Sequence, residues 1–142
     1  MSRSGYCDDI DGPELALWRG AVASAIRGKR GQALLRDMAA AMDAMPVKRL
    51  IARYLVKDGE VCALGAVACA RGMDVSGIDP ERYWTVASAF DIADALAREV
   101  EYWNDECGPY QETPEQRWTR MRAWVAGKIR KQEEGHAETN QT

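Results

Sequence analysis

Apolar residues recur at helical spacing over the first third of the chain. One stripe follows Pro13, a residue suited to the first turn of a helix, and a second stripe follows Gly31 and ends before Pro46. The pattern therefore predicts two helices, joined through residues 28–31 into a helical hairpin whose apolar stripes face each other or a common core. The first stripe consists of Leu15, Trp18, Val22, Ala25 and Ile26.

The period of the pattern changes in the middle of the chain. Residues 48–56 fit either an alternating strand or a helix, and the pair Asp58 and Gly59 that follows favours a two-residue hairpin turn. We therefore expect short strands near residues 49–56 and 60–63. Small helix formers come next, so the sequence predicts a short buried helix that ends at Gly72.

The second half of the chain again has helical periodicity. Pro80 is expected to open one helix and Asp91 to cap the next, which ends near residues 104–105. Thr113 and Gln116 have the spacing of a capping box, with a proline between them at the first helical position, so they predict the start of a final helix.

These elements define a mainly α (α+β) fold of five or six helices with one small two-stranded β-hairpin. The chain of 142 residues is long enough for one domain with its own hydrophobic core and too short for two. We expect a single globular domain over residues 1–131. Residues 132–142 contain no apolar residue except alanine and are expected to form a flexible polar tail.

Composition limits the classes of partner. The net charge of −3 and the pI near 5.3 argue against a general nucleic-acid binder, which needs a basic surface. No apolar run approaches the length of about 20 residues that a membrane span needs. The first residues lack the apolar core of a signal peptide. We therefore expect a cytoplasmic protein with no membrane partner.

The four cysteines are Cys7, Cys62, Cys69 and Cys107. An even number allows disulfides, but a cytoplasmic chain favours reduced thiols that pack as small apolar groups. No two cysteines have C-x-x-C spacing, and the single histidine, His136, lies in the polar tail. The sequence therefore predicts no zinc site, no other metal and no cofactor.

Cys62 is the candidate for thiol chemistry. It precedes the predicted short helix, and the N-terminus of a helix favours a thiolate. Asn104 or Asp105 would then orient a partner group. A cysteine nucleophile usually works with a histidine, and the chain offers only one, in the tail. The alternative is a buried thiol at a strand–helix junction that packs closely against Gly65, with residues 104–105 ending a helix.

A compact basic turn is the second candidate site. It combines Arg27, Lys29 and Arg30 with Arg19 on the preceding helix and Gln32 on the following one. Such a turn would bind an anion, an acidic protein surface or nucleic acid, or would simply be a solvated loop. A DNA-reading helix carries base-contacting side chains at its start, and here the second helix consists mostly of Ala, Leu and Met.

A third cluster contains the acids Asp8, Asp9 and Asp11. Carboxylates suit a divalent cation, but the glycine and terminal glutamate of a calcium loop are missing. We interpret this segment as a solvated acidic lead-in.

Five segments of the chain carry a resemblance: Met1–Tyr6, Trp18–Gln32, Gly59–Val67, Asn104–Asp105 and Thr113–Trp118. Together they resemble small, uncharacterised proteins of bacteriophages and prophages. Residues 62–66, the Asn-Asp pair and the closing helix are also similar to a wider bacterial and phage domain of unknown function. In the similar phage proteins, positions 53–54 tend to read Gly-Glu and position 7 tends to be Ser, which speaks against a catalytic role for Arg53, Tyr54 or Cys7.

The resemblance implies a phage-type accessory protein made inside a bacterium, and the similar proteins have no established activity to transfer to this chain. Our first hypothesis is a non-enzymatic protein that binds a host or phage protein, for example to inhibit a host defence system. The alternatives are nucleic-acid binding through the basic turn and a thiol-dependent enzyme using Cys62. The sequence leaves the oligomeric state open, with a homodimer among the options.

Overall fold

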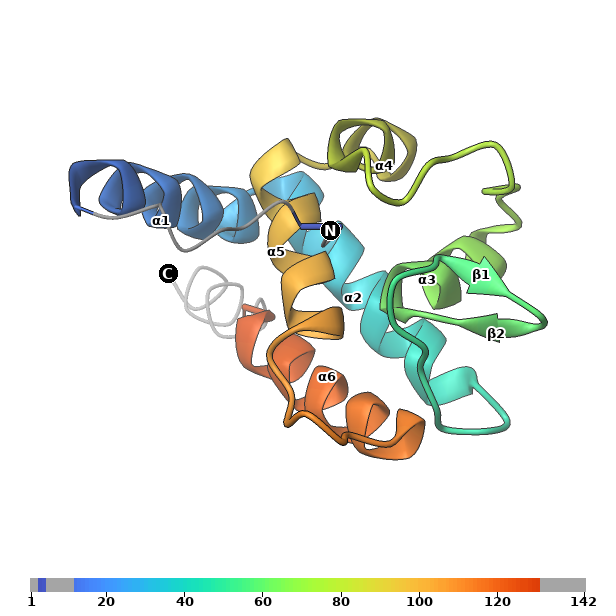
Figure 1. The fold of residues 1–142 in the computed structure, drawn as a ribbon. Coiled ribbons are helices and arrows are strands. Elements are labelled where there is room, and N and C mark those ends of the chain that lie inside the picture. Colours follow the sequence, from blue (N-terminus) through green and yellow to red (C-terminus); the bar gives the residue numbers. More distant parts are fainter. Residues whose placement is uncertain (1–2, 5–11, 131–142) are drawn as a thin grey trace, which may run out of the picture.

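The computed structural model describes residues 3–4 and 12–130. Over these residues it contains six α-helices and one two-stranded antiparallel sheet, so the predicted mainly α fold with a small hairpin is confirmed (Figure 1). Cys7, His136, the Asp8, Asp9 and Asp11 cluster and the predicted tail lie outside the described residues. The elements are α1 (Gly12–Arg27), α2 (Lys29–Ala44), β1 (Val56–Lys57), β2 (Glu60–Val61), α3 (Ala63–Arg71), α4 (Tyr83–Phe90), α5 (Asp94–Asp105) and α6 (Pro114–Lys128).

Local signals fixed several helix ends as expected. Thr113 caps α6 in a full capping box, because its side chain accepts from the Gln116 amide and the Gln116 side chain accepts from the Thr113 amide. Gly72 ends α3 with a left-handed φ of 68°. Asp91 was misplaced by the sequence argument: it ends α4 with φ 56° instead of starting α5. The helix expected from Pro80 begins only at Tyr83.

The hairpin turn is confirmed, but its strands are shorter than expected. Asp58 and Gly59 have φ of 53° and 80°, as a type I′ turn requires at both central positions. The strand predicted over residues 49–56 is wrong except at its end, and the one over 60–63 shrinks to two residues. The reason is that the segment before β1 turns back on itself through Arg53, whose φ is 73°.

The core lies between α2, α3, α4, α5 and α6. Leu34, Met38, Leu64, Phe90 and Leu96 are all buried there, and α3 is buried along most of its length, as its small residues predicted. The side chains buried in α6 are Met121, Trp124 and Val125.

Helix α1 corrects the predicted helical hairpin. It projects from one side of the molecule, and its only buried residue is Val22 (Figure 1). Leu15 is 41% exposed, whereas Val22 is buried and Ala25 and Ile26 pack against the core, so the predicted stripe faces the core only in the second half of α1. The two helices meet at the tight junction where a Cβ on Gly31 would lie 1.9 Å from the Ala25 carbonyl oxygen. The apolar stripes therefore diverge from this junction.

Gly65 shows why the hairpin and α3 need glycine. A Cβ at this position would lie 1.9 Å from the Leu55 carbonyl oxygen, which belongs to the backbone and cannot rotate away. That same carbonyl accepts the Cys62 amide at 3.1 Å. The hairpin is therefore pressed directly onto the first turn of α3.

Among the described residues, no helix has the length and apolar character to cross a membrane.

Candidate functional site

Cys62 lies at the N-terminus of α3, as the sequence predicted. It is the N-cap residue, and its Sγ accepts a hydrogen bond from the Gly65 amide at 3.4 Å. Its side chain is buried, with 1% of the residue exposed. The next amide, that of Ala63, donates to Asn104 Oδ1 at 3.1 Å. The first turn of α3 is thus satisfied by one thiol and one side-chain amide.

Asn104 and Asp105 join three parts of the chain at this point. The Asn104 amide nitrogen donates to the Ile51 carbonyl oxygen at 2.9 Å and to Asp105 Oδ1 at 2.8 Å. Asp105 Oδ1 also accepts the backbone N–H of Arg53 at 3.2 Å. The pair therefore ties the end of α5 to the segment before β1 and to α3. This tie is the structural role that the Asn-Asp pair has in the fold.

Arg3 is the residue of the site that the sequence argument missed. Its guanidinium forms a fork on Asp105, with 2.8 Å from Nε to Oδ2 and 2.6 Å from Nη2 to Oδ1. Its Nη1 lies 3.6 Å from Cys62 Sγ and donates to it. Only 2% of Arg3 is exposed. Nothing in the pattern around Arg3 indicates its burial, since an arginine is mostly exposed unless it is paired.

The resemblance contained the one signal that pointed to Arg3. Three of its segments, Met1–Tyr6, Gly59–Val67 and Asn104–Asp105, meet here through Arg3, Cys62 and Asp105. Nothing in their spacing along the chain reveals this meeting, because the contact between Arg3 and Asp105 spans 102 positions.

Glu101 places a second carboxyl group beside Arg3. Its Oε2 lies 3.4 Å from Arg3 Nε, but the single hydrogen of Nε is donated to Asp105. Both oxygens of Glu101 are buried and have no hydrogen-bond partner among the described residues. Burial raises the pKa of Glu101 to about 8, with Arg3 opposing the rise and Asp105 adding to it. At neutral pH this carboxyl group is therefore mostly protonated.

The charges around Arg3 keep it cationic. Burial by itself would lower the pKa of Arg3, but Cys62, Asp105 and Glu101 together raise it above its usual value. The arrangement holds the guanidinium in a fork on Asp105, with Cys62 and Glu101 beside it. It gives Cys62 no histidine within the described residues and covers its sulfur with Arg3, so the geometry does not favour nucleophilic chemistry.

The predicted basic turn does not gather its five residues on one surface. Arg19 pairs with Glu99 of α5 through contacts of 3.2 and 2.9 Å. Gln32 is buried, and its amide nitrogen donates to the Ile26 and Lys128 carbonyl oxygens, which ties α2 to the end of α6.

Lys29 and Arg30 of the turn line a shallow hollow of about 510 Å³ at the start of α2. Arg27 is exposed but does not line it, and Arg30 reaches Asp91 at 3.1 Å. The hollow is lined by Ala21, Ser24, Ala25, Gly28, Lys29, Arg30, Gly31 and Ala93.

The cysteines and acids of the described part of the chain assemble no metal site. Cys62, Cys69 and Cys107 are free thiols, and no group of three or more Cys, His, Asp or Glu residues is placed to hold an ion there.

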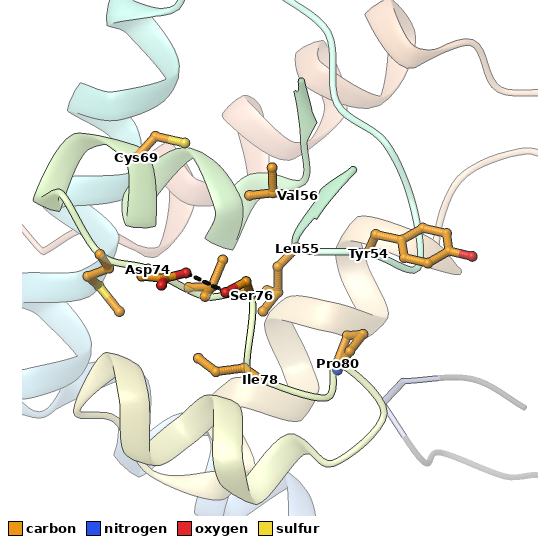
Figure 2. Close-up of a pocket in the computed structure, with 10 residues that line it drawn as sticks. Tyr54, Leu55, Val56, Cys69, Asp74, Ser76, Ile78 and Pro80 are labelled. Carbon is orange, nitrogen blue, oxygen red and sulfur yellow. Dashed lines mark hydrogen bonds between the residues drawn. The ribbon is translucent and has the colours of Figure 1, made fainter. Parts of the chain in front are cut away.

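An open groove beside the hairpin is a further site that sequence reasoning did not find. It has a volume of about 450 Å³ and lies between β1, the end of α3 and the loop that follows it (Figure 2). Tyr54 and Val56 are 44% and 42% exposed at its edge, and buried Leu55 lies between them. The groove is lined by Tyr54, Leu55, Val56, Cys69, Met73, Asp74, Val75, Ser76, Ile78 and Pro80.

The loop side of the groove is held in shape by Asp74. Its Oδ1 accepts both the amide of Ser76 at 3.0 Å and the hydroxyl of Ser76 at 2.7 Å, a bond that Figure 2 shows as a dashed line. The two bonds lower the pKa of Asp74, the hydroxyl bond most strongly. An anionic group therefore remains at the rim of an otherwise mainly apolar groove.

Strand β1, whose residue Val56 lines the groove, has an outer edge that faces away from β2. Leu55 and Cys62 form a hydrogen-bonded pair, so the next pair, Val56 and Val61, is a non-hydrogen-bonded one. The N–H and C=O of Val56 consequently point away from β2. The sheet has two strands, so no third strand among the described residues covers this edge.

The chain was compared with models of protein families, with curated proteins and with solved structures, and none of the three comparisons found a match.

Proposed function

We propose that this protein acts by binding another protein, without a catalytic step. The observation that carries the proposal is the groove beside β1, where an outward-facing strand edge, exposed apolar side chains and a hollow of about 450 Å³ coincide. Such an edge is a ready template for an extended segment of another chain.

The partner segment is extended and mainly apolar. Its backbone pairs with the N–H and C=O of Val56, and one apolar side chain enters the groove over Leu55 and Ile78. Main-chain pairing supplies affinity, and the groove selects the side chain. Tyr54 lies beside this edge with Lys57 Nζ 4.2 Å from its ring centroid, so an aromatic contact is available at the rim.

The Cys62 site and the groove differ in their access to solvent, and this difference supports a binding function. Its sulfur is covered by Arg3, whereas the groove opens to solvent. The side chains that first suggested chemistry are used to hold the fold together, and the exposed features suit recognition. The resemblance to phage proteins makes a host or phage protein in the bacterial cytoplasm the expected partner.

The test begins with capture of partners from a bacterial host lysate on the immobilised, folded chain. The captured protein is identified, and its affinity is measured for the wild type, Val56→Lys and Val47→Lys. Both valines are exposed, and Val47 lies in the segment that borders the opposite side of the hairpin, so it is a matched control.

We expect Val56→Lys to weaken binding by at least about tenfold, because a charged side chain at the edge opposes strand addition. Val47→Lys should bind as the wild type does. Equal affinity of all three proteins contradicts the proposal, as does repeated failure of the folded wild type to retain any partner.

A further inference from the structure

The residues around Arg3 form a pocket whose contacts are specific for a guanidinium group and for the residue that follows it. We call them the arginine pocket: Arg98, Glu101 and Asp105 of α5, the C-cap residue Glu106 that follows α5, and Cys62, the N-cap residue of α3. Arg98, Glu101 and Asp105 are spaced three and four positions apart, so they lie along one face of α5. Arg3 and Ser4 occupy the pocket and are almost fully buried in it.

Asp105 selects the guanidinium group. It takes two parallel N–H donors of Arg3, at 2.8 and 2.6 Å, and the third nitrogen of the group reaches Cys62 at 3.6 Å. A lysine ammonium is a point charge and cannot make this fork while also donating to the thiol.

The pocket also recognises the residue after the arginine. The Ser4 hydroxyl donates to Glu106 Oε2 at 2.7 Å, and its carbonyl oxygen accepts from Arg98 Nε at 2.5 Å. Arg98 is itself held over the rings of Trp18 and Tyr83, 4.4 and 4.7 Å from their centroids. Ser4 is fully buried, so its hydroxyl group is shielded from water where it meets Glu106.

Glu101 shows that the pocket holds more acceptors than Arg3 satisfies. Its two oxygens are buried within the pocket and have no hydrogen-bond partner among the described residues. Glu101 forms an ion pair with Arg3 at 3.4 Å, but neither of its oxygens accepts a hydrogen bond from a described residue, and a buried polar atom without a hydrogen bond costs stability. An acceptor surplus suits a pocket that receives its donors from a ligand.

We propose that the arginine pocket is a recognition site for an arginyl-seryl segment, and that the chain's own residues 3–4 occupy it in this structure. The same chemistry has two sources: the segment of the same chain, or that of another chain after the first has left. The arginine pocket is separate from the groove beside β1. A negative result for one site therefore does not bear on the proposal for the other.

The test uses the full-length Arg3→Ala variant, which empties the pocket of its guanidinium. The probes are methylguanidinium, methylammonium, the hexapeptide Met-Ser-Arg-Ser-Gly-Tyr and the same peptide with lysine in place of arginine. The readout is the midpoint of thermal unfolding as a function of probe concentration, since a ligand that binds only the folded state raises it.

We expect the arginine peptide to raise the midpoint in a saturable way, at a concentration at least about tenfold lower than the lysine peptide. Methylguanidinium should act at higher concentration and methylammonium should not act. The double variant Arg3→Ala, Asp105→Asn should respond to none of them. If Arg3→Ala does not fold, Arg3→Lys takes its place, because it keeps a cation in the pocket.

A folded variant that responds equally to the arginine and lysine peptides, or to neither, overturns the proposal. A second arm identifies the source. Arg3→Ala, which has an intact pocket, is mixed with Asp105→Asn, which has an intact segment. A mixed dimer with a raised midpoint shows that another copy supplies the segment. A response to the peptide without a mixed dimer shows that the segment is supplied within one chain.

Discussion

Arg3 and Asp105 are 102 positions apart in the sequence and are joined by two hydrogen bonds in the fold. Replacing Arg3 by alanine leaves Asp105 buried without its cation. Breaking a buried ion pair on one side typically costs about 3–5 kcal/mol, so we expect Arg3→Ala to lower the free energy of unfolding by about that amount. Urea unfolding followed by tryptophan fluorescence measures it.

The control is Arg30→Ala, which removes an exposed pair with Asp91. Exposed pairs contribute less than about 1 kcal/mol, so this variant should unfold almost as the wild type does. If both variants lower the free energy of unfolding by similar amounts, the buried Arg3–Asp105 pair contributes no more to stability than an exposed pair does.

Glu101 should make stability depend on pH. Its pKa is about 8 in the fold against an ordinary value of 4.5, so between these pH values the folded state binds more protons than the unfolded state. The contribution of Glu101 to stability is therefore full below pH 4.5 and is lost as pH rises to about 8, with a slope of up to about 1.4 kcal/mol per pH unit.

Glu101→Gln mimics the protonated carboxyl group and cannot ionise. Its free energy of unfolding should fall less steeply than that of the wild type between pH 5 and pH 8, and the two proteins should differ least at the acidic end. Urea titrations at several pH values give both slopes. Parallel curves would mean that Glu101 is already ionised in the folded protein at neutral pH.

Gly65 should tolerate no side chain. Gly65→Ala places a methyl group against the Leu55 carbonyl oxygen, so the hairpin must move away from α3. We expect a loss of at least about 2 kcal/mol in the free energy of unfolding. Gly20→Ala is the control: it lies in α1 with nothing within 4 Å of the new methyl group, and it should stabilise the protein by about 0.5–1 kcal/mol.

Two thiols should react at very different rates. Cys69 is exposed at the groove, whereas Cys62 is buried under Arg3. In a Cys7→Ser, Cys107→Ser background, an aromatic disulfide reagent at neutral pH should modify Cys69 at the rate of a free thiol and Cys62 only as the protein unfolds. Rapid modification of Cys62 in the folded protein would revive the thiol-enzyme hypothesis.

Local chemistry explains what the sequence predicted well. The Asp58-Gly59 turn, the capping box at Thr113 and the left-handed Gly72 each depend on a few neighbouring residues, and each was found where expected. Predictions failed where distant contacts override local preference. Residues 49–55 have the sequence pattern of a strand. However, the Leu50 amide donates a hydrogen bond to the Pro114 carbonyl oxygen, and the Ile51 amide donates one to the Val61 carbonyl oxygen.

The features of the sites also separate into those that follow from the local sequence and those that depend on distant contacts. Cys62 at a helix N-terminus follows from the small residues after it, and the close packing at Gly65 was part of that interpretation. The burial of Arg3 does not follow, because it requires Asp105 and Glu101 to be brought to the same place by the fold. The groove was also hidden, since it forms between β1 and a loop that local signals describe only as irregular.

The amide of Val56 is the most direct reporter of the proposed function. It points away from β2, and Val56 lines the groove, so pairing with a partner segment should protect it. Amide hydrogen exchange is measured for the folded protein alone and saturated with its captured partner. We predict slowing of the Val56 amide by more than about tenfold, with little change at Lys57, which already pairs with Glu60. Unchanged exchange at Val56 in the saturated complex would contradict binding at this edge.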